Sequence, residues 1–158
     1  MNTEIQSYIT YFEQAHADLG SLIASLSQEA LHWTPLKNGT NSPAILVTHM
    51  LGAERFRIHQ VVAGFEVARN RDTEFQTTTV TLTDILSSLE RLNDETKRVL
   101  SNITSADLNI IKPAARDYEN EESARWHIIH TVEHFGIHLG HLSLTIQMYN
   151  EHHQSRTS

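Results

Sequence analysis

Apolar residues recur every three or four positions in four long segments of the chain, and this spacing is the period of an amphipathic α-helix. The segments cover about residues 3–26, 43–64, 81–102 and 122–151. The second segment begins at a Ser-Pro pair, a common helix start signal, because serine caps the helix and proline fits its first turn. The pattern predicts an all-α protein, a four-helix bundle.

The three connections between these segments are longer than the tight turns of a simple up-and-down bundle; they cover residues 27–41, 65–80 and 103–121. We therefore expect at least one of them to cross the bundle, and a short extended piece near Asn109–Pro113 in the last. The fourth helix is the longest and is apolar on more than one side, so we expect it to be central. A chain of 158 residues is long enough for one core, which predicts a single domain over residues 1–158.

Composition narrows the classes of function. Lys and Arg total 12 against 19 Asp and Glu, without a basic run, and this excludes the charge pattern of a nucleic-acid-binding protein. The polar N-terminus and the lack of a long apolar run predict a cytoplasmic protein without a membrane partner. There is no cysteine, so a metal must be held by nitrogen and oxygen ligands, and a sulfur nucleophile must come from a cosubstrate.

Five histidines in the fourth helix provide the main chemical signal: His127, His130, His134, His138 and His141. At about 100° per residue their rings fall within an arc of roughly 80° on one helix face. His134 and His138 are four residues apart and can chelate one metal ion, whereas His130 and His141 lie one turn beyond the pair and are candidates to line a pocket. The alternative is a polar seam satisfied by hydrogen bonds or water.

A third ligand must come from another helix, and His49 is the best candidate because it lies among apolar residues on the inward face of the second helix. Three histidines leave a coordination position for water or substrate, as in catalytic zinc sites. His16 interrupts the apolar stripe of the first helix, where it either borders the cavity or is a hydrogen-bonded core residue. Glu54 points roughly 140° away from His49, which favours an ion pair or a helix-packing role over metal binding.

Two stretches around these histidines, residues 41–54 and 133–141, resemble the DinB/YfiT-like metalloenzyme superfamily, and Leu31-His32-Trp33-Thr34-Pro35 matches the aromatic-proline stretch of that family. The resemblance covers essentially the whole chain. It implies a DinB/YfiT-like four-helix bundle with a long crossover, a divalent metal on His49, His134 and His138, and a homodimer. The chain departs from the commonest family ending, His-Arg-Gly-Gln, which is His138-Leu139-Gly140-His141 here.

Family members with assigned activities include S-transferases that use bacillithiol, mycothiol or glutathione. The resemblance therefore implies a metal-dependent thiol S-transferase or hydrolase with a small-molecule substrate and a low-molecular-weight thiol cosubstrate. Zn²⁺ or Ni²⁺ is the expected metal, with Mn²⁺ or Fe²⁺ as alternatives.

The alternative function is a non-catalytic, metal-stabilised dimeric module for binding or stress response. It is favoured by the expected lack of a carboxylate beside the ligands to act as general base. We interpret the charged segment 69–75 as a solvated connection; the alternative is that its arginines reach an anionic substrate.

Overall fold

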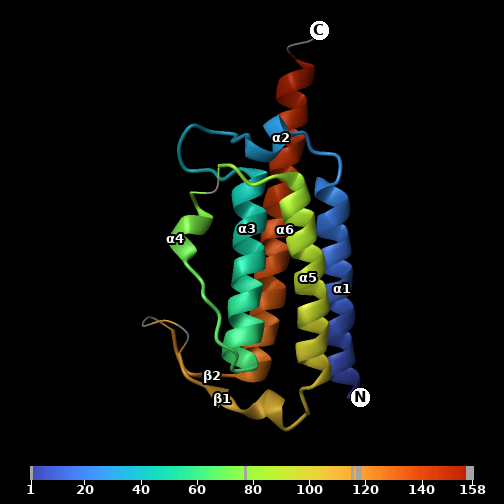
Figure 1. Cartoon of the computed structure of the whole chain (residues 1–158), viewed down its shortest axis with the longest axis vertical. Helices are drawn as coiled ribbons and strands as arrows, with labels where there is room; N and C mark the ends of the chain where they lie inside the picture. Colours follow the sequence, from blue (N-terminus) through green and yellow to red (C-terminus); the bar gives the residue numbers. More distant parts are fainter. Residues whose placement is uncertain (1, 77, 115, 117–118, 156–158) are drawn as a thin grey trace.

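The computed structural model describes residues 2–76, 78–114, 116 and 119–155. Four long helical rods lie side by side (Figure 1), which confirms the predicted all-α four-helix bundle. They are α1 (Thr3–Ile23), α3 (Pro43–Glu54) with its continuation η1 (Arg55–Val62), α5 (Leu82–Ser101) and α6 (Ala124–Gln154). The second rod differs from the expectation of a regular helix, because η1 is a π-helix.

Side chains at the start of each rod explain why the helices begin where they do. Ser42 precedes Pro43 and accepts a hydrogen bond from the backbone of Ile45. Thr81 and Asp84 form a reciprocal capping box at the start of α5, and Ser123 caps α6 through the backbone of Trp126. These caps satisfy backbone N–H groups that have no partner within the helix.

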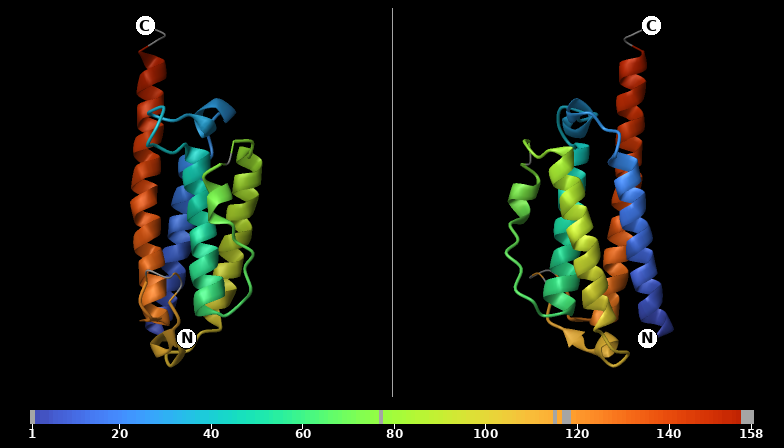
Figure 2. Two further views of the ribbon diagram at one scale, coloured as in Figure 1. Left: turned by 90° about the vertical axis from the view of Figure 1, so that its left-hand side faces the viewer. Right: turned by 45° about the vertical axis from the view of Figure 1, so that its right-hand side comes forward.

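The long connections contain short elements of their own: α2 (Gln28–His32), α4 (Arg71–Glu74) and η2 (Asp107–Asn109). The extended piece expected in the last connection is present, since β1 (Ile111–Lys112) pairs in antiparallel fashion with β2 (Glu122–Ser123). The connection that carries α4 runs along the outside of the bundle, and α4 packs on α3 (Figure 2). This placement brings loop residues to the face of α3 that carries His49.

The core has two parts along the bundle, and α6 contributes to both. Phe135 and Leu142 pack with Leu19, and Ile128 packs with Phe12 at the other end. The expectation that this helix is central is wrong, because α6 packs on α1 and on the α3–η1 rod just as α5 does, and in Figure 2 it extends beyond the other rods. The side of α6 that faces away from the bundle is open, and several large apolar residues there are about half exposed: Ile129, Ile137, Leu144 and Met148.

Among the described helices, none combines the length and the apolar character that crossing a membrane requires.

Candidate metal centre

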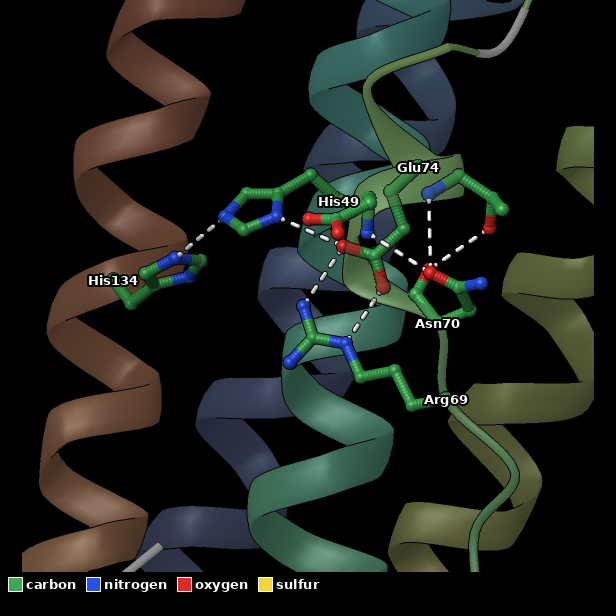
Figure 3. Close-up of polar contacts among 7 residues, drawn as sticks. His49, Arg69, Asn70, Glu74 and His134 are labelled. Carbon is green, nitrogen blue, oxygen red and sulfur yellow. Dashed lines mark hydrogen bonds and ion pairs between the residues drawn. The ribbon is translucent and has the colours of Figure 1, made fainter. Parts of the chain in front are cut away.

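Three histidines from two helices converge at the interface of α3 and α6. The Nε2 atoms of His49 and His134 are 3.1 Å apart (Figure 3), and the His138 ring centroid lies 5.1 Å from that of His49 and 4.4 Å from that of His134. One potential ligand nitrogen from each residue lies within 4.8 Å of the others. The His49 side chain reaches this point because Leu46, Met50 and Ala53 on the same helix face are buried against the bundle.

The geometry fits a divalent cation. Two imidazole nitrogens at about 2.0–2.1 Å from one tetrahedral ion are roughly 3.3 Å apart, close to the His49–His134 separation of 3.1 Å. His138 Nδ1 is buried and has no hydrogen-bond partner among the described residues. A buried polar atom without a partner is costly, and this one belongs to a residue whose ring faces the other two.

The protonation state of the ligands also suits a metal. Burial, with the neighbouring His138 and His49 rings, lowers the pKa of His134 to about 3. Burial, with His49 and His141, lowers the pKa of His138 to about 4. Both rings are therefore neutral near pH 7 and can offer a nitrogen lone pair to a cation.

Glu74 of α4 orients His49 from behind. Its Oε2 lies 3.0 Å from His49 Nδ1, so that Nδ1–H donates to the carboxylate and Nε2 points toward His134 (Figure 3). Burial tends to raise the pKa of the Glu74 carboxyl, but hydrogen bonds from Arg69 and His49 outweigh it and hold that pKa below its ordinary value. An ionised carboxylate behind a metal-binding imidazole fixes its tautomer and strengthens it as a ligand.

Arg69 binds Glu74, and Gly52 leaves room for the Glu74 side chain. Arg69 donates from Nε to Glu74 Oε1 at 2.6 Å and from Nη2 to Oε2 at 2.8 Å. Asn70 caps α4 by accepting hydrogen bonds from the backbones of Asp72 and Thr73. Gly52 provides space, since a Cβ atom there would lie 2.9 Å from Glu74 Cδ and nearer still to Oε1.

The interpretation of segment 69–75 as a solvated connection is wrong at this point. The segment 69–75 is not simply a solvated connection, because Glu74 is buried and the Arg69 side chain is only 9% exposed. The carboxylate of Glu74 lies beside a candidate ligand, but it faces the nitrogen of His49 that points away from the other histidines and so is not placed as a general base for the site. Glu74 is thus placed to orient the ring. The sequence hides this pairing because the two residues are 25 positions apart and lie on different helices, α3 and α4, whose relative placement depends on the irregular connection 63–70.

A cavity of about 430 Å³ opens beside the three histidines. His130 lines it, and the His130 ring stacks on Trp126 with centroids 4.9 Å apart and planes at 6°. Phe75 forms another wall, with its ring centroid 5.0 Å from that of His49. The remaining described lining residues come from α3, η1, α6 and the connections: Asn41, Leu46, Ala53, Arg57, Arg69, Arg71, Arg116, Glu119 and Thr131.

The other two pocket candidates lie elsewhere in the described structure. His16 is buried in the core, with its ring nitrogens 2.7 Å from Glu54 Oε2 and 3.0 Å from Asn93 Oδ1. Glu54 is fully buried and also accepts a hydrogen bond from Thr96, which matches the polar pairing expected for it. His141 is exposed on α6, with its ring centroid 5.5 Å from that of His138. Neither is among the lining residues.

Sequence reasoning also missed a buried polar network at the far end of the cavity. Arg57 donates from Nη2 to Glu119 Oε1 and from Nη1 to His127 Nδ1, which lies 3.1 Å away. Burial, together with the Arg57 charge, lowers the pKa of His127 to about 4. The sequence does contain one signal for this network. Arg57 lies on the inward face of the second helix, and a buried arginine requires a buried polar partner.

Comparisons with known proteins identify a family for this chain and solved structures that share its fold. A sequence model of the family described as mycothiol-S-transferase matches residues 8–147. YfiT from Bacillus subtilis, described as a probable metal-dependent hydrolase with an unusual four-helix bundle topology, superposes with a TM-score of 0.76 and 13% identity; the match covers 95% of this chain and 90% of YfiT. The DinB-like protein YjoA, also from Bacillus subtilis, gives a TM-score of 0.70 and 17% identity, covering 91% of this chain and 92% of YjoA.

At these identities the two structures establish the shared fold, and a search of curated proteins gives no match. The sequence model, by contrast, covers most of the chain and includes all three converging histidines. The chain therefore belongs to the mycothiol-S-transferase family of the DinB-like superfamily.

Proposed function

We propose that this chain is a divalent-metal-dependent enzyme that transfers a thiol to, or hydrolyses, a small-molecule substrate. The observation that carries the proposal is the convergence of His49, His134 and His138 at the wall of a cavity of about 430 Å³. Membership of the mycothiol-S-transferase family, and the description of YfiT as a probable metal-dependent hydrolase, support a reaction of this kind.

A bound divalent cation would act as a Lewis acid and lower the pKa of water or a thiol at its open position. The chain's own residues prepare the site for this chemistry. His49 is held by Glu74 with Nε2 directed inward, and His134 and His138 present neutral rings from successive turns of α6. Phe75 and His130, whose ring stacks on Trp126, provide aromatic walls of the cavity.

The sulfur nucleophile of a transfer reaction must be a low-molecular-weight thiol, because the chain has no cysteine. The description of the matching family names mycothiol as the thiol of that family. For the metal, nitrogen ligands suit Zn²⁺ or Ni²⁺, and Mn²⁺ and Fe²⁺ are the alternatives, since availability as well as ligand type decides which ion is bound.

Metal analysis of purified protein, combined with an assay of thiol consumption, tests the proposal. Wild type should contain about one metal ion per chain and consume thiol in the presence of a suitable electrophile. His138→Ala should lose both properties while the helix content measured by circular dichroism is retained. Stoichiometric metal in a protein lacking both His134 and His138 would contradict the assignment.

A second function rests on the open side of α6. Ile129 and Ile137 are each 51% exposed there and Leu144 is 57% exposed, which suits contact with a second copy of the chain. A metal-stabilised dimer that binds a ligand without turnover would use this face. A large loss of thermal stability on adding a chelator, without thiol consumption on any electrophile tested, would favour this function over the enzyme.

A further inference from the structure

Arginine is concentrated around the candidate metal site. Arg57, Arg69, Arg71 and Arg116 all line the cavity of about 430 Å³, and they are four of the 12 basic residues of a chain with net charge −7. Glu119 is the carboxylate among the described lining residues, and Glu74 lies behind Arg69. Among the described residues, four guanidinium groups therefore face two carboxylates, an excess of two positive charges before any metal ion is counted.

Two of these arginines are fixed by their ion pairs. Arg69 is held by both oxygens of Glu74, and Arg57 is held between Glu119 and His127. Their side chains are only 9% and 6% exposed, so their charges are in place before a ligand arrives. A fixed positive charge at a partly enclosed cavity attracts anions more strongly than a mobile charge on an open surface.

The other two arginines are more accessible. The Arg71 guanidinium lies over the Phe75 ring at 5.0 Å from its centroid, and the same ring lies 5.0 Å from that of His49. Arg71 is exposed, so its guanidinium group is accessible to a ligand. Arg116 lies 3.9 Å from Glu119 Oε1, an oxygen that Arg57 also contacts. Arg71 therefore brings a positive charge to the wall of the cavity that is next to the metal site.

We propose that the substrate of this site is a small oxyanion, a molecule with a carboxylate or phosphate group that Arg71 and Arg116 bind while its reactive atom faces the three histidines. This inference rests on the proposed function and adds the substrate class to it. The planar guanidinium group donates two parallel hydrogen bonds to either anion, and the cavity has the volume of a small-molecule site.

Calorimetric titration of the full-length protein tests the proposal, with succinate, inorganic phosphate and the uncharged analogue succinamide as probes. Each probe is titrated into zinc-loaded wild type and into Arg71→Gln, Arg116→Gln and Arg91→Gln. Arg91 is an exposed α5 residue that contacts Ser88, so Arg91→Gln makes the same change of charge outside the cavity. Zinc content and thermal stability are measured for every variant, which shows whether each one folds and loads metal.

At least one anion should bind wild type while succinamide does not, and Arg71→Gln should weaken that anion about tenfold with unchanged zinc content. Arg91→Gln should bind as wild type. A preference for succinate identifies a carboxylate substrate, and a preference for phosphate identifies a phosphorylated one. Equal affinity in the wild type, Arg71→Gln and Arg116→Gln would overturn the proposal, as would equal binding of succinate and succinamide.

A variant without metal separates this inference from the proposed function. In His138→Ala, arginine-dependent anion binding should persist at lower affinity. Complete loss of anion binding in this variant would mean that the anion binds the metal alone. That result would overturn the anion site formed by the arginines but would not contradict the proposed metal site of the wild type. If the wild type binds no metal but still binds anions through these arginines, the proposed metal-dependent function would be contradicted and the anion site would be supported.

Discussion

Replacing Gly52 by alanine tests the support of the metal site without touching a ligand. The new Cβ atom would lie 2.9 Å from Glu74 Cδ and 3.4 Å from Arg69 Nε, and nearer still to Glu74 Oε1. The two side chains are held together by two hydrogen bonds, so the carboxylate has to move away from α3 to relieve the clash. His49 then loses the acceptor for its Nδ1–H.

Loss of such a partner behind a ligand typically lowers metal affinity by about 10- to 100-fold, or roughly 1.4–2.7 kcal/mol of binding free energy. The free energy of unfolding should change less, because alanine is about 1 kcal/mol more favourable than glycine inside a helix and offsets part of the lost ion pair. We therefore expect Gly52→Ala to bind zinc more weakly while its metal-free form melts close to the wild-type temperature.

Competition with a chromophoric chelator measures the zinc affinity, and thermal melting of metal-free protein measures the stability. Gly140→Ala is the matched control: it also changes a helical glycine, but nothing lies within 4 Å of its added Cβ atom. This control should keep wild-type affinity and gain up to about 1 kcal/mol of stability. Wild-type zinc affinity in Gly52→Ala would refute the role assigned to Glu74.

Four further predictions follow from the site and its surroundings. Glu74→Gln keeps the size of the side chain but removes its charge, and should lower zinc affinity about tenfold in the same titration; an unchanged affinity would contradict the His49–Glu74 interaction. At a free metal concentration of 100 times Kd the cation adds about 2.7 kcal/mol to stability, so chelation should lower the Tm of wild type by roughly 5–10 °C but leave His138→Ala unchanged. The pKa of His127 is about 4 in the folded protein, below its ordinary 6.5, so the unfolded chain takes up the proton first as the pH falls. The free energy of unfolding should therefore fall by up to about 3 kcal/mol between pH 6.5 and pH 4. Urea unfolding should show a smaller fall in His127→Asn than in wild type, and an equal dependence of stability on pH in the two proteins would contradict this prediction. Sedimentation velocity should give a homodimer that Ile137→Lys shifts toward monomer, whereas a monomeric wild type would exclude this use of the α6 face.

The helices and the three converging histidines could be predicted because both depend on local periodicity. A residue four positions from another lies one turn away on the same helix face, which places His134 beside His138. Apolar neighbours on one face show that His49 points toward the bundle interior. The four-helix fold then leaves few places where an inward residue of the second helix can meet the histidine face of the last.

Other parts of the site depend on the path of irregular chain, which periodicity does not describe. The connection with α4 returns along α3 (Figure 1), so Glu74 reaches His49 from outside the four rods, and Arg69 reaches Glu74 there. Glu119 reaches Arg57 in the same way from the connection before β2. The face of a helix on which a residue lies also does not determine which neighbour that residue contacts: His16 faces Glu54 and Asn93, not the cavity.

Crystallographic location of the metal tests the central claim most directly. A crystal of zinc-loaded protein, measured on both sides of the zinc absorption edge, should show one anomalous peak per chain about 2.0–2.1 Å from a nitrogen of each of His49, His134 and His138. The peak should face the cavity, and His49 Nδ1 should still contact Glu74. A fully loaded crystal whose only peaks lie away from these three residues would contradict the account.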